Sequence, residues 1–154
     1  MVEDVWTYPR PPALQAVPDK IRIRFARLLI AETTAAFRVL ETSHPPVYYL
    51  PRECFRDCVV VPAPGGSFCE WKGGARYWTI QAGGRQADSV AWSYPAPTPA
   101  FTAIADHLAV YAGPMDGCFV GDEQVTPQPG GFYGGWVTIN LKGPFKGSPG
   151  TAGW

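Results

Sequence analysis

Apolar and polar side chains alternate along short stretches of the chain, a pattern that is typical of half-buried β-strands. The clearest example is residues 20–25, where two arginines lie on one face and Ile21, Ile23 and Phe25 lie on the other. We expect residues 29–33 to pair with this strand after a tight reversal near 26–27. Similar patterns predict further strands over 37–40, 47–50, 58–61, 77–81, 85–87, 90–94, 108–111 and 118–120.

Turn and helix signals separate these strands. Pro64-Gly65-Gly66 predicts a turn, and Gly83-Gly84 predicts the turn of a hairpin. The apolar run 58–61 has no polar face, so we expect it to be a buried strand. One helix is predicted from Pro99 to about residue 106, with Thr98 as its N-cap, and a single helical turn is predicted over 51–55.

The predicted fold is therefore mainly β, a compact sheet-like or barrel-like single domain of short antiparallel strands with one short helix. A length of 154 residues suits one domain with one core. A weak internal echo exists, because the pattern of residues 31–37 recurs, with a slip of one residue, in 87–92. It indicates either a pseudo-duplicated β unit or a coincidence between two hairpins.

The two ends of the chain differ in composition from the middle. Residues 1–19 hold four prolines and predict an extended N-terminal arm, and residues 20–126 form the predicted core domain. Residues 127–154 hold eight glycines and four prolines but also several aromatic residues, so this C-terminal tail is too aromatic for a simple linker. We expect the arm or the tail to serve as a contact for the body, for a protein partner or for a homo-oligomer.

Charge and cysteine spacing narrow the classes of function. Thirteen basic residues balance thirteen acidic ones, so no net field favours nucleic acid or a membrane surface as a partner. The N-terminus lacks the pattern of a secretory signal, and the expected location is the cytoplasm. The four cysteines form no Cys-x-x-Cys spacing, so we expect no bound metal and no cofactor.

Three separated segments carry a resemblance to a known family: residues 40–51 (LETSHPPVYYLP), 68–78 (FCEWKGGARYW) and 91–95 (AWSYP). Over roughly residues 18–126 the chain resembles the domain of unknown function 427 (DUF427) family. The resemblance implies a compact, mainly β fold, and the family has carried a nucleotidyltransferase label. Such chemistry normally needs magnesium-binding acidic residues beside a Gly-Ser turn, and Gly65-Gly66-Ser67 is followed by no Asp-x-Asp pair.

The same segments supply a candidate ligand site of polar groups mounted on aromatic bodies. Aromatic walls would stack against a flat or cationic ligand, while Glu41 and Lys72 would orient it. We expect Glu41, Lys72, Tyr77 and Trp92 to meet in one partly open pocket. The full set of candidate ligand-binding residues is Glu41, His44, Tyr48, Tyr49, Cys69, Lys72, Tyr77, Trp78, Trp92 and Tyr94.

Other interpretations of these residues stay open at this point. Glu41 and Lys72 form a structural ion pair in one of them, and the aromatic rings simply fill the core. In another, Cys69 and His44 form a nucleophilic pair, because a nearby imidazolium generates the reactive thiolate. Three hypotheses follow: a small-molecule binding or sensing module, an enzyme, and an interaction subunit that uses the arm and the tail.

Overall fold

The alternating segment near residue 21 forms the first of two hairpins that organise the fold. A computed structural model describes residues 2–154. In it β3 (Ile21–Phe25) pairs with β4 (Leu28–Thr33), and β11 (Gly117–Val120) and β12 (Glu123–Gln124) extend this antiparallel sheet in the order β12-β11-β3-β4. The residues at the turn, Ala26 and Arg27, both have positive φ, the geometry of a tight reversal that usually takes glycine.

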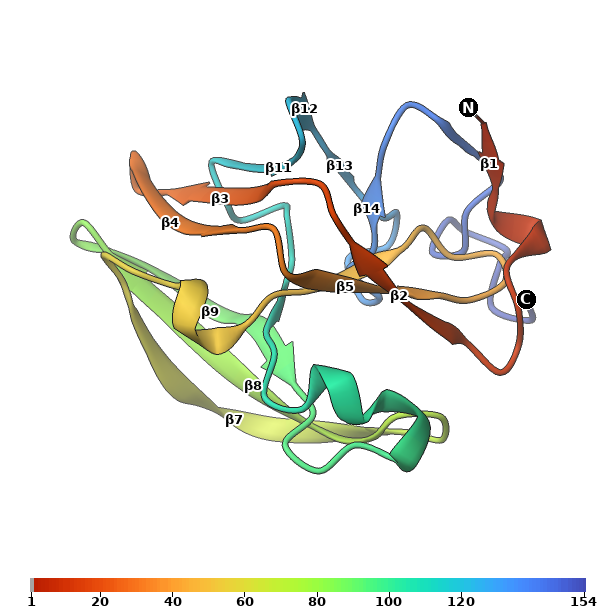
Figure 1. Cartoon of the computed structure of the whole chain (residues 1–154), viewed down its shortest axis with the longest axis horizontal. Helices are drawn as coiled ribbons and strands as arrows, with labels where there is room; N and C mark the ends of the chain where they lie inside the picture. Colours follow the sequence, from red (N-terminus) through yellow and green to blue (C-terminus); the bar gives the residue numbers. More distant parts are fainter. Residues whose placement is uncertain (1) are drawn as a thin grey trace.

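The second hairpin belongs to a separate four-stranded antiparallel sheet. Its strands are β7 (Val59–Cys69), β8 (Gly73–Ala82), β9 (Arg85–Ser93) and β10 (Ala109–Val110), in the order β10-β9-β8-β7. The turn at Gly83-Gly84 lies as predicted, and both glycines have positive φ. The tips of the two hairpins meet at the left of Figure 1, where a Cβ on Gly83 would lie 3.0 Å from the Cβ of Ala26.

The remaining strands come from the arm, the middle and the tail. A three-stranded antiparallel sheet has the order β2-β5-β6, with β2 (Ala13–Val17), β5 (Ala36–Leu40) and β6 (Val47–Tyr49). β1 (Glu3–Asp4) pairs in parallel with β15 (Leu141–Lys142), and β13 (Thr126–Pro127) pairs with β14 (Trp136–Val137). The arm therefore contributes a strand to the body, and the mainly β prediction is confirmed.

The sheets stay separate, and within residues 2–154 they do not close into a barrel. The internal echo falls on both hairpins but in different ways. Its first copy leaves β4 at Thr33 and enters another sheet at Ala36, because β5 begins there, whereas residues 87–92 all lie within β9. No helix in the described part of the chain is long and apolar enough to cross a membrane.

Three local predictions are wrong. The element at Pro99 is a 3₁₀ helix, η3 (Pro99–Ile104), rather than a helix to residue 106, and Thr98 makes no side-chain cap. Residues 58–61 are not a buried strand, because β7 is an edge strand and Val59 is 56% exposed. Residues 64–66 do not turn the chain, since β7 continues through them with a register shift between Pro62 and Gly66.

The structure contains two other 3₁₀ helices. One is η1 (Val5–Thr7), and the other is η2 (Arg52–Cys54), which forms the helical turn predicted over 51–55.

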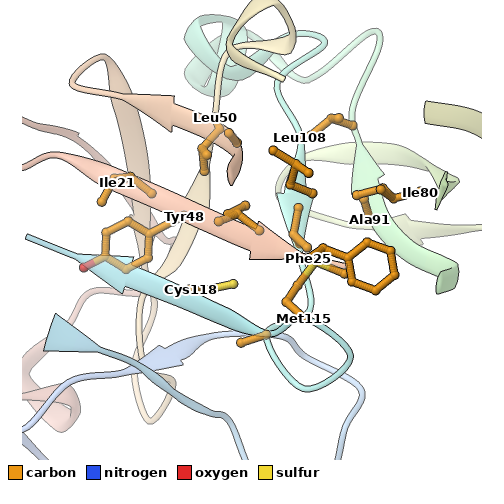
Figure 2. Close-up of a cluster of buried hydrophobic side chains, with 14 of the residues drawn as sticks. Ile21, Phe25, Tyr48, Leu50, Ile80, Ala91, Leu108, Met115 and Cys118 are labelled. Carbon is orange, nitrogen blue, oxygen red and sulfur yellow. The ribbon is translucent and has the colours of Figure 1, made fainter. Parts of the chain in front are cut away.

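The main core lies between the two hairpin sheets and β6. Aliphatic residues dominate it, and Figure 2 shows Ile21, Leu50, Ile80 and Leu108 among the buried side chains of this cluster, together with Phe25. Each of these side chains is at most 1% exposed. Complete burial of one such side chain contributes about 1.5–3 kcal/mol relative to leaving it in water, so this region carries much of the stability.

The C-terminal tail packs on the body of its own chain. Trp136 is 1% exposed, its ring stacks on Tyr48 with the ring centroids 5.1 Å apart, and its Nε1–H donates to the carbonyl of Val110 at 3.0 Å. Farther along, the ring of Trp154 meets Trp6 edge-on with centroids 5.0 Å apart. The tail is thus an integral part of this fold and holds the N-terminal residues as well.

Candidate functional site

A cavity of about 310 Å³ opens between the three-stranded sheet, the β7–β8 turn and β9. Its walls come from residues far apart in the sequence, including the end of β5, the loop before β6 and the tail. Of the ten residues proposed from the sequence, eight line this cavity: Glu41, His44, Tyr49, Cys69, Lys72, Tyr77, Trp92 and Tyr94. The four residues expected to meet in one pocket are all among them.

Tyr48 and Trp78 lie outside the cavity because strand geometry turns them away. Neighbouring side chains on a strand point to opposite faces, so Tyr48 points away from the face of Tyr49 and stacks on Trp136. Trp78 stands next to Tyr77 on β8, and its Nε1–H donates to Ser93 Oγ at 2.9 Å. These two side chains serve packing on the other faces of their strands.

Aromatic rings form the inner wall of the cavity. Trp92 is 6% exposed, and its ring centroid lies 4.7 Å from that of Tyr111 and 6.5 Å from that of Tyr49. Burial raises the pKa of Tyr49 well above its ordinary value and also raises that of Tyr94. These phenols therefore stay neutral at physiological pH and present hydroxyl groups that donate or accept hydrogen bonds.

His44 occupies the cavity as a neutral imidazole with a fixed tautomer. Gln128 determines this, because its Oε1 accepts from the backbone N–H of Gly135 at 3.0 Å while its Nε2 donates to the carbonyl of Lys146 at 2.9 Å. The second Nε2 hydrogen then points to His44 Nδ1, 3.1 Å away, so that nitrogen accepts and the proton is on Nε2.

Burial is the main reason that His44 is neutral, and it lowers the pKa of the ring to about 4. The positive charges of Lys146, Arg10 and Lys72 lower this pKa further. Glu41 is the carboxylate that faces the ring, with its Oε2 3.7 Å from His44 Nε2. At neutral pH the ring thus offers one N–H donor and carries no charge.

Glu41 and Lys72 do not form the ion pair that the sequence left open. Glu41 Oε2 lies 3.5 Å from the guanidinium Nη2 of Arg10, a residue of the N-terminal arm. Within residues 2–154 no carboxylate oxygen lies within 4.0 Å of the Lys72 ammonium. That ammonium instead lies over the rings of Tyr94 and Phe101, 5.7 and 6.0 Å from their centroids.

The backbone around Lys72 is held by the segment before η3. The N–H of Thr98 donates to the Lys72 carbonyl at 3.1 Å, and the Thr98 hydroxyl donates to the carbonyl of Trp71. Gly73 has φ +107°, a backbone conformation that residues other than glycine rarely adopt. This conformation lets the chain enter β8 directly after Lys72. The lysine therefore stands on a fixed turn.

Cys69 and His44 line the same cavity, but the structure does not show the hydrogen bond that joins a nucleophilic pair. No hydrogen bond joins the Cys69 sulfur to His44 among the contacts of the described residues. Nor does the part of the chain that the structure describes contain a cluster of three or more His, Cys, Asp or Glu side chains of the kind that holds a metal ion. The lining of the cavity thus combines aromatic rings with the neutral imidazole of His44, the ammonium of Lys72, the sulfur of Cys69 and the carboxylates of Glu41 and Glu70.

The tail contributes residues that the sequence did not place in the site. Phe132 and Tyr133 line the cavity, and the ring of Tyr133 meets His44 edge-on with centroids 4.8 Å apart. Tyr111 donates its hydroxyl hydrogen to the Phe132 carbonyl at 2.6 Å, and the backbone of Gly134 packs so closely against the Trp92 ring that a Cβ would not fit there. The aromatic richness of the tail was the only sequence signal for this contact.

Comparison with protein families identifies a match. A family model described as "Domain of unknown function (DUF427)" matches residues 13–121, which include β2 and end before the tail. No curated protein matches the chain. Every cavity residue proposed from the sequence lies inside the matched region, whereas Gln128, Phe132 and Tyr133 lie beyond it.

Proposed function

Because this chain belongs to the DUF427 family, whose description assigns no function, we propose from its cavity that it is a small-molecule binding or sensing module with an aromatic pocket. The observation that carries the proposal is the convergence on one cavity of side chains from the three family-like segments. Leu, Ile and Val would bury the same area without polar atoms that need partners. Polar tips beside an open space are therefore better explained by a ligand than by stability.

The size and shape of the cavity limit the ligand. A volume of about 310 Å³ is at the lower end of the range of roughly 300–1,000 Å³ for small-molecule sites. Rings such as Trp92 and Tyr111 favour flat molecules, because stacking or edge-on contact is strongest with another planar group. The N–H of His44 supplies one directional hydrogen bond. We therefore expect a ligand of one or two rings with at least one hydrogen-bond acceptor.

Ligand-observed NMR and calorimetry with benzoate, benzamide, benzimidazole and quinoline test this function. At least one of these compounds should bind the wild-type protein, and Trp92→Leu should weaken that binding by tenfold or more because it removes an indole ring from the inner wall. Trp78→Leu is the matched control, since Trp78 lies on β8 outside the cavity. It should bind as the wild type does, with folding of each variant checked by circular dichroism.

A second variant covers the case in which Trp92→Leu does not fold. Val47→Phe adds volume at a partly buried position of the cavity wall and should also weaken binding. The proposal is wrong if none of the four compounds binds. It is equally wrong if Trp78→Leu weakens binding as much as Trp92→Leu, or if folded Val47→Phe binds as well as the wild type.

A further inference from the structure

A buried lysine without a counter-ion is the least expected feature of the cavity. Lys72 is 8% exposed, and within the described residues its ammonium has neither a carboxylate within 4.0 Å nor a hydrogen-bond acceptor. Lysine is almost never buried this far unless it is paired. The one fully inaccessible polar side-chain atom without a partner in residues 2–154 is Ser43 Oγ. The Lys72 nitrogen therefore keeps some accessible surface, and the space that this residue lines is the cavity.

The other charged groups near the cavity do not neutralise Lys72. Glu41 is paired with Arg10, and Lys146 donates to the carbonyl of Trp154 at 3.0 Å. His44 carries no charge at neutral pH, and the Lys72 charge is one of the causes that lower its pKa, after burial, Lys146 and Arg10. Glu70 lies at the rim and is exposed. Among the described residues that line the cavity, Lys72 is thus the only lysine or arginine, and no carboxylate of the chain neutralises its charge.

We propose that the ligand of this cavity is a planar aromatic carboxylate, whose carboxylate group is neutralised by Lys72 and whose ring lies against Trp92 and Tyr49. This inference rests on the proposed function and gives its ligand a chemical class. Attraction between the carboxylate and the ammonium is strengthened where water is excluded, and it offsets the cost of burying both charges. A single ammonium matches a single negative charge, whereas a phosphate dianion is usually met by several donors or by arginine forks.

Aromatic walls alone would also suit a cationic ligand, since ring faces attract positive charge. Here the rings of Tyr94 and Phe101 already face the Lys72 ammonium. A second cation would meet repulsion from Lys72 in a region of low dielectric. The position of this one side chain therefore decides between an anionic and a cationic ligand, and ligand charge is the variable to measure.

Three probes of similar shape and different charge make the test: benzoate, benzamide and benzylamine, titrated by calorimetry at pH 7.5 and low salt. Benzoate should bind at least tenfold more tightly than benzamide, and benzylamine should bind most weakly. In Lys72→Met the affinity for benzoate should fall to within about twofold of that for benzamide, while benzamide binding persists. Lys142→Met removes an exposed lysine of β15 as the matched control, and it should keep the wild-type preference.

The outcomes separate this inference from the proposed function. If benzamide binds as tightly as benzoate, the charge assignment is wrong and the binding function stands. Tighter binding of benzylamine would overturn the assignment in the opposite sense. An equal loss of preference in Lys142→Met would show that overall charge, rather than Lys72, sets the selectivity. If none of the three probes and neither of the two-ring compounds binds, the proposed function fails together with the inference. The wild-type series decides the charge question even if Lys72→Met does not fold.

Discussion

Two neighbouring regions of this protein bury side chains of different kinds. The core between the hairpin sheets is built from Ile21, Ile23, Ile80 and Leu108, which have no polar atoms to satisfy. The second cluster, beside the cavity, also contains aliphatic residues but includes three buried aromatic residues with polar tips, Tyr49, Trp92 and Tyr94. The contrast indicates that the first region supplies stability and that the second gives up some of it to keep chemical groups available.

The largest expected effect is loss of a core side chain. Ile80 is fully buried in the main core, so Ile80→Ala should lower the free energy of unfolding by about 2–5 kcal/mol. Ile139 is 92% exposed, and Ile139→Ala makes the same chemical change at the surface, where we expect less than about 0.5 kcal/mol. Urea denaturation measures both. Similar losses in the two variants would contradict the placement of the core.

The next largest effect is expected from acid, which should lower the free energy of unfolding through the titration of His44 in the cavity. The pKa of His44 is lowered to about 4 in the folded protein from an ordinary value of 6.5, because burial disfavours the charged ring. The unfolded chain then binds more protons between these values. The contribution is constant above pH 6.5, and the free energy of unfolding should fall by about 3 kcal/mol as the pH drops from 6.5 to 4.

Removal of the imidazole isolates this effect from the titration of carboxylates. His44→Asn should have a shallower pH dependence of stability over that window than the wild type, measured by denaturation at a series of pH values. His107→Asn is the matched control, because it removes the other histidine of the chain and leaves His44 in place. If the free energy of unfolding depends on pH in the same way in the wild type and in His44→Asn, the His44 ring has the same pKa in the folded and the unfolded chain, and the prediction is wrong.

Loss of Gln128 should have a smaller effect on stability and a specific effect on His44. Gln128→Leu leaves His44 Nδ1, the Gly135 N–H and the Lys146 carbonyl without their partner, at a cost of about 1–3 kcal/mol. The substitution also removes the donor that keeps the His44 proton on Nε2, so ¹⁵N spectra of the imidazole should show a mixture of the two tautomers. Gln124→Leu, an exposed control, should change neither quantity. An unchanged tautomer in folded Gln128→Leu would refute the assigned role.

The smallest expected effect on stability belongs to the residue with the largest expected effect on ligand choice. The Lys72 nitrogen keeps some accessible surface and has no carboxylate partner, and methionine retains the apolar stem, so Lys72→Met should change the free energy of unfolding by less than about 1 kcal/mol. Thermal melting measures this directly. A decrease of several kcal/mol in the free energy of unfolding would instead identify Lys72 as half of a structural ion pair. The cavity region would then contribute to stability as the main core does.

Local sequence patterns determined much of this fold. Alternation in residues 21–25 identified β3, and Gly83-Gly84 located the β8–β9 turn, because both signals depend on backbone geometry and side-chain period over a few residues. The family-like segments also contained the eight proposed residues that line the cavity. Alternation further accounts for Tyr48 and Trp78, which face away from their cavity-lining neighbours.

Tertiary structure decided the features that depend on what a segment packs against. The apolar run 58–61 predicted burial, but the position of β7 at the edge of its sheet leaves Val59 exposed. Glu41 found Arg10 rather than Lys72 because the N-terminal arm returns to the site, and the tail brings Gln128 to His44 across 84 positions of sequence. Such contacts are set by the packing of whole sheets and chain ends, and no short pattern encodes them. The types of group at the site could thus be read from the sequence, while their partners, and so the unpaired charge of Lys72, were decided only by the tertiary structure.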